Sequence, residues 1–278
     1  MKKGHTLNGS VKSIKELSYL RKYDPEQLIK GNRARLTDAD LLSVNDKSYD
    51  YYSVYDTNDQ LTEHHVISSN DQILERSSHT HNKEENKNEI ITYDAHSKLK
   101  NKILLFYDLS GNTIKTHYYD AKEAMTMEEI SEYDTKGNGI KSSSFLMPDK
   151  ELFSQSINEY DTNSNKVAMK IYSINGSSTT LLVNNIYIYD DNNLLIEELE
   201  FTDENEFNLV KRKTYTYNEK GDKIEVCFFN SELDVIKRSK NEYIYDEKNN
   251  WTQCVIYLAE GKEEAYPSYI IEREIEYY

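Results

Sequence analysis

The chain has 278 residues, of which 34 are basic and 49 acidic, so its formal net charge at pH 7 is −15. This acidity argues against a nucleic-acid partner, because such partners require basic surfaces that displace counterions. Only 37% of the residues are hydrophobic, and no run approaches the roughly 20 apolar residues of a transmembrane helix. Tyrosine is the exception, with 24 copies against 7 Phe and 1 Trp. Such a composition predicts thin sheets, where a ring packs by its face and keeps one edge in water.

Residues 1–50 fit the later pattern poorly and are predicted to form an N-terminal cap. Residues 7–19 are compatible with a strand or the start of a helix, and residues 24–31 with one short capped helix. No signal peptide is visible, since the chain enters polar sequence directly after Met1. We therefore expect either a cytoplasmic protein or an exported one whose leader has been removed, and we favour the second.

A repeated Tyr-Asp dipeptide organises residues 51–278. From Tyr133 onward the heads of the repeat stand at positions 133, 160, 189, 217 and 245, so their spacing is nearly constant. A second aromatic side chain follows each of these heads at a fixed distance, as Phe145 follows Tyr133 and Tyr172 follows Tyr160. The heads are Tyr55, Tyr93, Tyr107, Tyr119, Tyr133, Tyr160, Tyr189 and Tyr245, each followed by Asp, with Tyr217-Asn218 as a variant.

Turn-forming residues follow each head, as in Asp134-Thr135-Lys136-Gly137-Asn138. The Asp or Asn can accept a hydrogen bond from the backbone two residues on. The fourth residue after Tyr is mostly one that tolerates a positive φ, which a type I turn closed by a left-handed residue requires. Each head is therefore predicted to end one strand and begin a hairpin.

The residues after each turn align in columns. The seventh residue after Tyr is apolar in most repeats, as in Ile114 and Ile140, and the eighth is mostly polar. This alternation is typical of a half-buried strand. Polar residues where a core would require Leu, such as Ser142 and Glu198, predict shallow packing. We predict an all-β fold, a long antiparallel β-meander of hairpin repeats over residues 51–278 that forms a curved sheet or partial β-shell.

The motif Tyr-Asp-x-x-Gly-Asn resembles the YD-repeat, or RHS-repeat, family. Residues 107–112 and 133–138 match it fully and residues 217–222 nearly, while residues 250–278 are similar to the tails of short exported YD-repeat proteins of Bacteroidetes-like bacteria. The resemblance implies a curved or spiralling sheet, which encloses a toxin domain in large members and serves adhesion or carbohydrate binding in others. This chain has too few repeats to enclose cargo, so we expect an open arc. No catalytic residue is carried over.

Histidine is concentrated at His64-His65 and at His79 and His81. A metal site would need both groups on adjacent strands. Pairing about the turn between them instead places Thr62 opposite His79. We therefore expect no metal centre and no cofactor.

Other candidate chemistry is weaker. Residues 56–59 and 161–165 resemble the start of a calcium loop, but Tyr172 stands where the second would need its bidentate Glu, so a simple turn is expected. Carboxylate doublets such as Glu197-Glu198 point to opposite faces of a strand and cannot form a glycosidase pair. Cys227 and Cys254 lie on strands separated by a third, so we expect two unlinked thiols.

Tyrosines recur at positions i and i+2 of three strands, which places each pair on one face. Such aromatic rows bind sugars or peptides, since they offer flat area at low entropy cost. The alternative, which the sequence favours, is that the rings join successive repeats through cross-strand pairs. The candidate ligand-binding residues are Tyr187, Tyr189, Tyr215, Tyr217, Tyr243 and Tyr245.

These features predict a non-enzymatic binding or scaffold protein with a carbohydrate or protein ligand. We expect it in the periplasm, at the cell surface or secreted. The alternative is a cytoplasmic immunity or antitoxin-type protein, whose acidity would suit a basic toxic partner.

Overall fold

The computed structural model describes residues 7–22, 27–34 and 50–278, and all regular elements in these ranges are β-strands. No helix in these ranges is long and apolar enough to cross a membrane. The strands in chain order are β1 (Val11–Lys22), β2 (Ile29–Arg33), β3 (Asp50–Tyr55), β4 (Leu61–Ile67), β5 (Ile73–Asn82), β6 (Lys87–Asp94), β7 (Leu99–Tyr107), β8 (Thr113–Tyr119), β9 (Met125–Tyr133), β10 (Gly139–Leu146), β11 (Glu151–Tyr160), β12 (Lys166–Asn175), β13 (Ser178–Tyr189), β14 (Leu195–Phe201), β15 (Leu209–Tyr217), β16 (Lys223–Phe229), β17 (Val235–Tyr245), β18 (Trp251–Glu260) and β19 (Tyr266–Tyr277).

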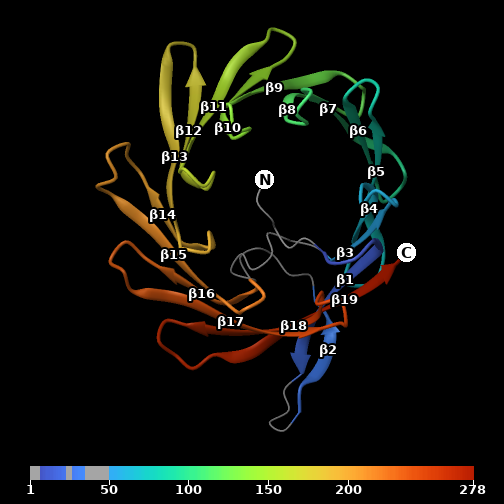
Figure 1. Ribbon diagram of the computed structural model, residues 1–278, viewed down its shortest axis with the longest axis vertical. Coiled ribbons are helices and arrows are strands. Elements are labelled where there is room, and N and C mark those ends of the chain that lie inside the picture. Colours follow the sequence, from blue (N-terminus) through green and yellow to red (C-terminus); the bar gives the residue numbers. More distant parts are fainter. Residues whose placement is uncertain (1–6, 23–26, 35–49) are drawn as a thin grey trace. The chain divides into compact units, whose positions relative to one another are not determined.

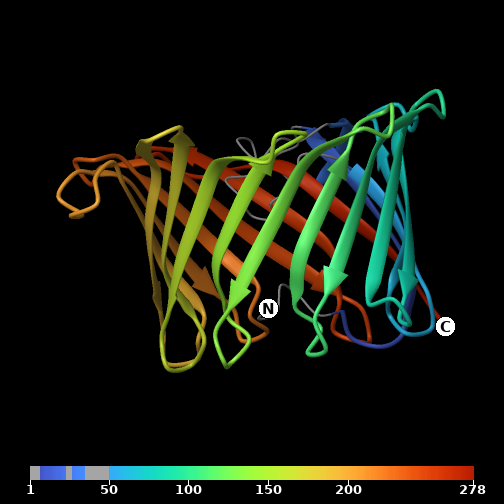
Figure 2. The ribbon, with the colours of Figure 1, turned by 90° about the horizontal axis from the view of Figure 1, so that it is seen from above.

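The strands belong to two compact units, each described by itself. Unit 1 comprises the described parts of residues 1–78, 94–96 and 214–278, and unit 2 comprises residues 79–93 and 97–213. The division falls within β5, at the last residue of β6 and within β15. In unit 2, consecutive strands from β6 to β14 pair antiparallel wherever their register is defined, as β9 does with β10 and β13 with β14. Figure 2 shows the yellow-green strands of this unit side by side, with turns at both ends. The predicted all-β antiparallel meander is confirmed.

The Tyr-Asp heads form the predicted reversals. After Tyr133, the Asp134 carboxylate oxygen Oδ1 accepts hydrogen bonds from the backbone N–H groups of Lys136 (2.9 Å) and Asn138 (2.8 Å). Gly137, the fourth residue after Tyr, has a φ of 82°. The same position is left-handed at Ser164, with a φ of 63°. The side chain of the head's second residue therefore holds the turn, and the fourth residue supplies the backbone conformation that closes it.

Each hairpin also contains a bulge beside its aromatic head. Tyr133 pairs with Gly139, but Glu132 pairs with Lys141, so Ile140 has no partner in the register. Because a bulge residue is left out of the ladder, it does not follow the regular alternation of faces. The apolar seventh column is this bulged position, and Ile140 remains 36% exposed. The two-residue alternation predicted for this part of the repeat is therefore interrupted at the bulge.

Tyr133 and Tyr160 each fasten their turn to the turn two strands earlier, on the same edge of the sheet. The Tyr133 hydroxyl donates to the carbonyl of Thr113 (2.8 Å), which is the residue paired with Tyr107. The Tyr160 hydroxyl donates in the same way to the Gly139 carbonyl (3.1 Å), and Gly139 is paired with Tyr133. The spacing of the heads therefore places both hydroxyls at the base of the turn two strands earlier.

The first and last strands, β1 and β19, lie side by side in unit 1 (Figure 1). It pairs antiparallel with β19 along one side, from Val11 opposite Tyr277 to Leu20 opposite Tyr269. Along its other side it pairs with β3 and then with β2. The expectation of an open arc is wrong at this point, since the first and last strands hydrogen-bond to each other and neither is a free edge.

The N-terminal region contains strand where a helix was expected. From Val11 the segment predicted as strand or helix is strand β1. The short helix expected over residues 24–31 is not formed at its C-terminal end, because Ile29–Arg33 is strand β2 and finds backbone partners on β1, with Lys22 opposite Ile29. Residues 23–26 lie outside the described ranges. The domain boundary at residue 50 stays a prediction.

Buried apolar side chains gather in unit 1. One cluster contains Trp251, Cys254 and Ile256, and another contains Ile14 and Tyr51. In unit 2 the buried side chains are mostly polar, namely Thr116, Glu128, Ser143, Asn165, Asn184 and Asn185, with Ala168. The thin packing agrees with the polar columns of the sequence.

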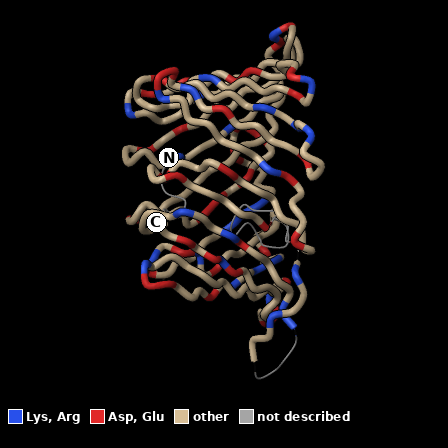
Figure 3. Tube along the Cα trace, turned by 90° about the vertical axis from the view of Figure 1, so that its right-hand side faces the viewer, with Lys and Arg blue, Asp and Glu red and all other residues tan. Residues whose placement is uncertain are grey.

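Ion pairs replace apolar packing on both faces of the unit 2 sheet. On neighbouring strands β14 and β15, Lys213 pairs with Glu198 (3.4 Å) and Arg212 pairs with Glu197. Because successive strand residues point to opposite faces, these two pairs lie on different faces. Figure 3 shows acidic and basic residues interspersed along the strands.

Removing the hydroxyl of Tyr133 tests the fastening between hairpins. We expect Tyr133→Phe to lower the free energy of unfolding by about 1 kcal/mol, since a typical neutral hydrogen bond contributes that much. Urea unfolding measures the change. Tyr266→Phe, at a ring that is 61% exposed, should have no effect, and equal losses in both variants would contradict the tether.

The turn geometry predicts a ranking of substitutions at Gly137. Asn193 and Asn249 occupy the same turn position at a φ of 62°, whereas a β-branched residue is strained there. Gly137→Ile should therefore cost about 1–2 kcal/mol more in unfolding free energy than Gly137→Asn. Thermal unfolding of the two variants checks this, and the reverse order would rule out the left-handed turn.

Candidate functional site

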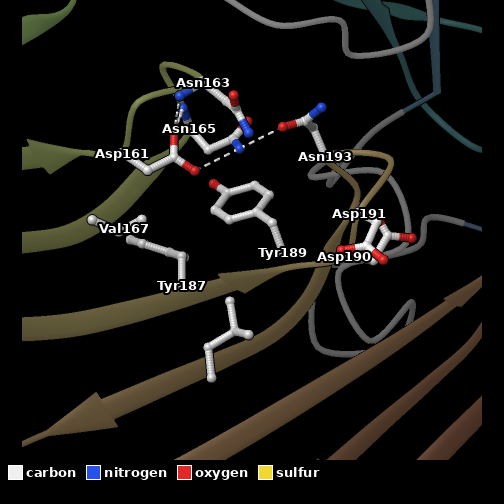
Figure 4. A pocket seen from close by; sticks show the side chains of 10 residues that line it. Asp161, Asn163, Asn165, Val167, Tyr187, Tyr189, Asp190, Asp191 and Asn193 are labelled. Carbon is white, nitrogen blue, oxygen red and sulfur yellow. Dashed lines mark hydrogen bonds between the residues drawn. The ribbon is translucent and has the colours of Figure 1, made fainter.

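An open hollow of about 400 Å³ lies in unit 2 between two neighbouring turns (Figure 4). One turn, residues 161–165, joins β11 to β12, and the other, residues 190–194, joins β13 to β14. The end of β13 passes between the two turns and supplies tyrosine side chains. The lining residues are Asp161, Asn163, Asn165, Val167, Tyr187, Ile188, Tyr189, Asp190, Asp191 and Asn193.

Both turns are held by their own aspartates. Asp161 Oδ1 accepts hydrogen bonds from the backbone N–H groups of Asn163 and Asn165, each at 2.8 Å. Asp190 Oδ1 accepts equivalent bonds from the N–H groups of Asn192 (2.9 Å) and Leu194 (2.8 Å). These carboxylates are thus oriented by the backbone and place negative charge at fixed points of the rim.

A buried amide joins the two turns. Asn165 is 5% exposed, and its Nδ2 donates to both Asp161 Oδ2 and Asn193 Oδ1, each at 2.8 Å. Figure 4 shows this link crossing above the ring of Tyr189. The spacing of the turns is therefore fixed by a side-chain bridge as well as by the sheet.

Tyr189 lies between the turns. Its hydroxyl donates to the carbonyl of Lys166 (2.9 Å), so the ring is anchored at its polar end. Burial, followed by the neighbouring Tyr187 and Asp161, raises the pKa of this hydroxyl above its ordinary value. Tyr189 therefore stays neutral and presents a fixed ring to the hollow.

Tyr187 stands two residues earlier on the same face of β13. The Nδ2 of buried Asn185 lies 3.4 Å from the Tyr187 hydroxyl oxygen and 3.4 Å from Glu198 Oε1. Burial, with a smaller contribution from the Glu198 and Glu200 carboxylates, raises the pKa of Tyr187. Tyr187 and Tyr189 were predicted to share a face of their strand. Both line the hollow.

The lining of the hollow combines aromatic rings with carboxylates. The ten lining residues supply aromatic rings, amides and three aspartates, but no His, Cys, Ser or Lys side chain. Two of the three carboxylates already accept backbone hydrogen bonds. A ligand would thus meet flat apolar area and fixed negative charge.

The other four predicted tyrosines belong to unit 1 and are more enclosed. Tyr215 is 6% exposed, and Lys223 Nζ lies 4.3 Å from its ring centroid. The rings of Tyr243 and Tyr245 are 6.2 Å apart along β17, and Tyr217 is half-buried. Burial raises the pKa of both Tyr243 and Tyr245.

The hydroxyls of these tyrosines connect consecutive hairpins. Tyr243 donates to the carbonyl of Lys223 (2.9 Å), and Tyr245 donates to Asp222 Oδ2 (2.5 Å). Asn218 Nδ2 in turn donates to the Tyr245 hydroxyl oxygen (2.8 Å). These contacts favour the alternative in which the tyrosines join repeats. Ligand binding by the six residues stays a prediction.

His64 and His65, for which no metal site was predicted, contact different side chains. His64 Nδ1 lies 2.9 Å from Ser53 Oγ, and its ring stacks on Tyr51 with a centroid distance of 5.5 Å. His65 lies 3.4 Å from Glu63. Among the residues that the structure describes, no group of three or more His, Cys, Asp or Glu could hold a metal ion.

The two thiols are unlinked, as predicted. Cys227 on β16 is half-buried and Cys254 on β18 is buried, with β17 between them. Burial raises the pKa of Cys254, so its thiol stays protonated.

The sequence analysis did not identify Asn165, Asn193 and Asp191 as residues of a binding site. Asn165 occupies the last place of the Tyr-Asp-x-x-Gly-Asn motif, so the motif itself carried a signal that was attributed to turn formation. Asn193 and Asp191 carry no such signal, because their role depends on which turns become neighbours.

No protein-family model and no curated protein matches this sequence. A crystal structure of a porin-like protein from Bacteroides uniformis aligns over 97% of this chain and 99% of that chain, at 10% identity and a TM-score of 0.46. A DUF1329 family protein from Desulfovibrio piger aligns over 96% and 86%, at 7% identity and a TM-score of 0.23. The TcdB2-TccC3-Cdc42 crystal structure aligns over 80% of this chain but 20% of that chain, at 10% identity and a TM-score of 0.20. At these scores the similarities assign neither family nor function, and membership of the YD-repeat family stays a prediction.

The lowered pKa of a turn aspartate makes the free energy of unfolding depend on pH in the acidic range. Hydrogen bonds from the backbone and side chain of Asn138 hold the pKa of Asp134 below its usual range. A carboxyl whose pKa is lowered by folding stabilises the fold above its ordinary pKa of about 3.9 and loses that contribution as the pH falls through the folded-state value. Asn218 makes the same two backbone contacts, both at 2.9 Å, without a titrating group.

We therefore expect Asp134→Asn to lose less stability than the wild-type protein when the pH falls from about 5 to about 2. Thermal unfolding at several pH values measures the difference. Parallel loss in the two proteins would show that the Asp134 turn does not contribute to acid sensitivity.

Proposed function

We propose that the protein is a non-enzymatic binding protein of the YD-repeat type, with hairpins as scaffold and the hollow between residues 161–165 and 190–194 as ligand site. The observation that carries this proposal is that Tyr187 and Tyr189 line an open space bounded by fixed carboxylates. Tyr189 also fastens hairpins in the way that Tyr133 and Tyr160 do, since its hydroxyl donates to the carbonyl of Lys166. Its ring in addition lines this open space.

The proposed ligand is a carbohydrate or a protein. Tyrosine rings offer both classes a rigid amphipathic surface at low entropic cost. The similarity of the motif and of residues 250–278 to exported YD-repeat proteins supports a site in the periplasm, at the cell surface or outside the cell.

A second candidate is an immunity or antitoxin-type protein bound to a basic toxic partner. The net charge of −15 and the three aspartates around the hollow favour it. Complementary charge would accelerate the encounter with a basic surface and suppress acidic partners. Both candidates use the same tyrosines, so one set of variants tests them.

Binding to immobilised bacterial envelope polysaccharides and to a panel of basic proteins tests the proposal. We expect at least one ligand to bind wild type and to lose about tenfold or more in affinity with Tyr187→Ala, as truncation of an aromatic anchor typically costs. Surface plasmon resonance provides the affinities, and circular dichroism confirms that the variant keeps its strands.

Tyr266→Ala is the matched control, since this ring is 61% exposed and lies outside the hollow. It should bind as wild type does. Binding that is unchanged by Tyr187→Ala, or no binding to any member of either panel, would refute the proposal.

A further inference from the structure

Strands β19 and β1 meet in the register of a Tyr-headed hairpin, although no turn of the chain joins them. Tyr277 on β19 pairs with Val11 on β1. The next pair is Glu276 with Ser13, so Lys12 has no partner in the register. A complete hairpin such as β9–β10 has the same one-residue bulge directly beside its head tyrosine.

Residues 8–10 supply the closing contacts of such a turn. The Tyr278 N–H donates to the Ser10 carbonyl (3.1 Å), and an equivalent bond of 2.9 Å closes the turn of the β9–β10 hairpin. Gly9 has a φ of 81°, and Gly137, at the left-handed position of the complete turn, has a φ of 82°. The backbone of the two segments therefore has the conformation and the hydrogen bond of one turn.

The number of residues also corresponds. In the β9–β10 hairpin, residues 135–136 fill the two places between the second residue of the head and the left-handed glycine. Residues 7–8 stand directly before Gly9 and provide the same number. A peptide bond from Tyr278 to residue 7 would therefore give a turn of unchanged length.

Buried Asn250 holds the N-terminal half of this turn. In the complete turn a carboxylate beside the head accepts an N–H from the middle of the turn, whereas Tyr278 has no side-chain carboxylate. Asn250 Oδ1 instead accepts the Asn8 N–H (2.8 Å). Its Nδ2 donates to the Asn8 carbonyl (2.8 Å) and to the Tyr277 hydroxyl oxygen (2.7 Å). The Tyr278 hydroxyl fixes the other half by donating to the Tyr55 carbonyl (2.7 Å).

We propose that residues 7–10 and 277–278 are the two halves of one Tyr-headed turn, and that this non-covalent clasp controls the separation of β1 from β19. In a complete hairpin the peptide bonds of the turn keep both strands close after their hydrogen bonds break. Across the clasp only hydrogen bonds and packing do so, and the pair can therefore open from this end. Opening would expose unpaired backbone groups at the end of β19. The inference concerns unit 1 and is independent of the ligand site in unit 2.

Backbone cyclisation tests the clasp. Intein-mediated ligation closes residues 7–278 into a ring in which Tyr278 is joined directly to residue 7, with Leu7→Cys as the ligation residue. The full linear chain carrying Leu7→Cys is the reference, because Leu7 packs against the apolar cluster that contains Ile14 and Tyr51. We expect the amide hydrogens of β1 to exchange about tenfold or more slowly in the ring, since its two halves cannot separate. Equal exchange in the ring and the linear chain would overturn the inference.

The length of the join distinguishes a turn from a loose tether. Two glycines inserted between Tyr278 and residue 7 of the ring should lower the midpoint of thermal unfolding. The matched control is the same insertion between Asp134 and Thr135 of the directly joined ring, at the equivalent place of the complete turn. The two losses should agree within about twofold, whereas the entropy of a loose tether changes little with length.

Three results would contradict the split turn. The first is an insertion at the join that costs nothing while the insertion after Asp134 lowers the midpoint. The second is a directly joined ring that unfolds at a lower temperature than the ring with two extra glycines, because the direct bond would then be strained. The third is failure of both rings to fold, since the linear chain already holds the two halves in contact.

Discussion

The hydrogen bond from a head tyrosine to the base of the preceding turn is the constraint on which the described architecture depends. Tyr133 and Tyr160 each donate to the carbonyl of the residue paired with the head tyrosine of the turn two strands earlier, Tyr107 and Tyr133. A hydroxyl at the end of a rigid ring can reach that carbonyl only if successive hairpins keep the same length and the same bulge. The nearly constant spacing of the heads is thus a mechanical requirement of the tether, and it allows a sheet with few buried apolar side chains to keep its register.

The same hydrogen bond is made beside the hollow, where the Tyr189 hydroxyl donates to the carbonyl of Lys166 (2.9 Å). A tyrosine anchored by its hydroxyl presents its ring to whatever the neighbouring turn supplies. Where the turn supplies Lys220, the ring of Tyr245 is covered. Where it supplies Asn163, the ring of Tyr189 faces a hollow. A tyrosine anchored by its hydroxyl can therefore either be covered by a lysine of a neighbouring turn or line an open space, on the same scaffold.

Much of this local structure could be predicted from residues alone. The Asp after each tyrosine, the left-handed fourth residue and the two-strand repeat follow from elementary turn chemistry, and the structure has them as expected. The bulge could not be predicted in the same way, because a one-residue slip beside Tyr133 depends on how two strands meet. Ile140 belongs by alternation to the apolar column of a regular half-buried strand, but it lies at the bulge. The short helix expected before Gly31 failed for a related reason, since strand β1 offered backbone partners that local propensity does not reveal.

The sequence by itself determined the unit of construction, because turn formation, side-chain alternation and tyrosine spacing are properties of neighbouring residues. Only the tertiary structure decided what those units do at long range. It paired β1 with β19 and buried the Glu16–Arg273 ion pair (2.8 Å), whose members are 257 residues apart. It also brought the turns at Asp161 and Asp190 together around Tyr189. Contacts of this kind depend on which strands become neighbours, and no local pattern specifies that.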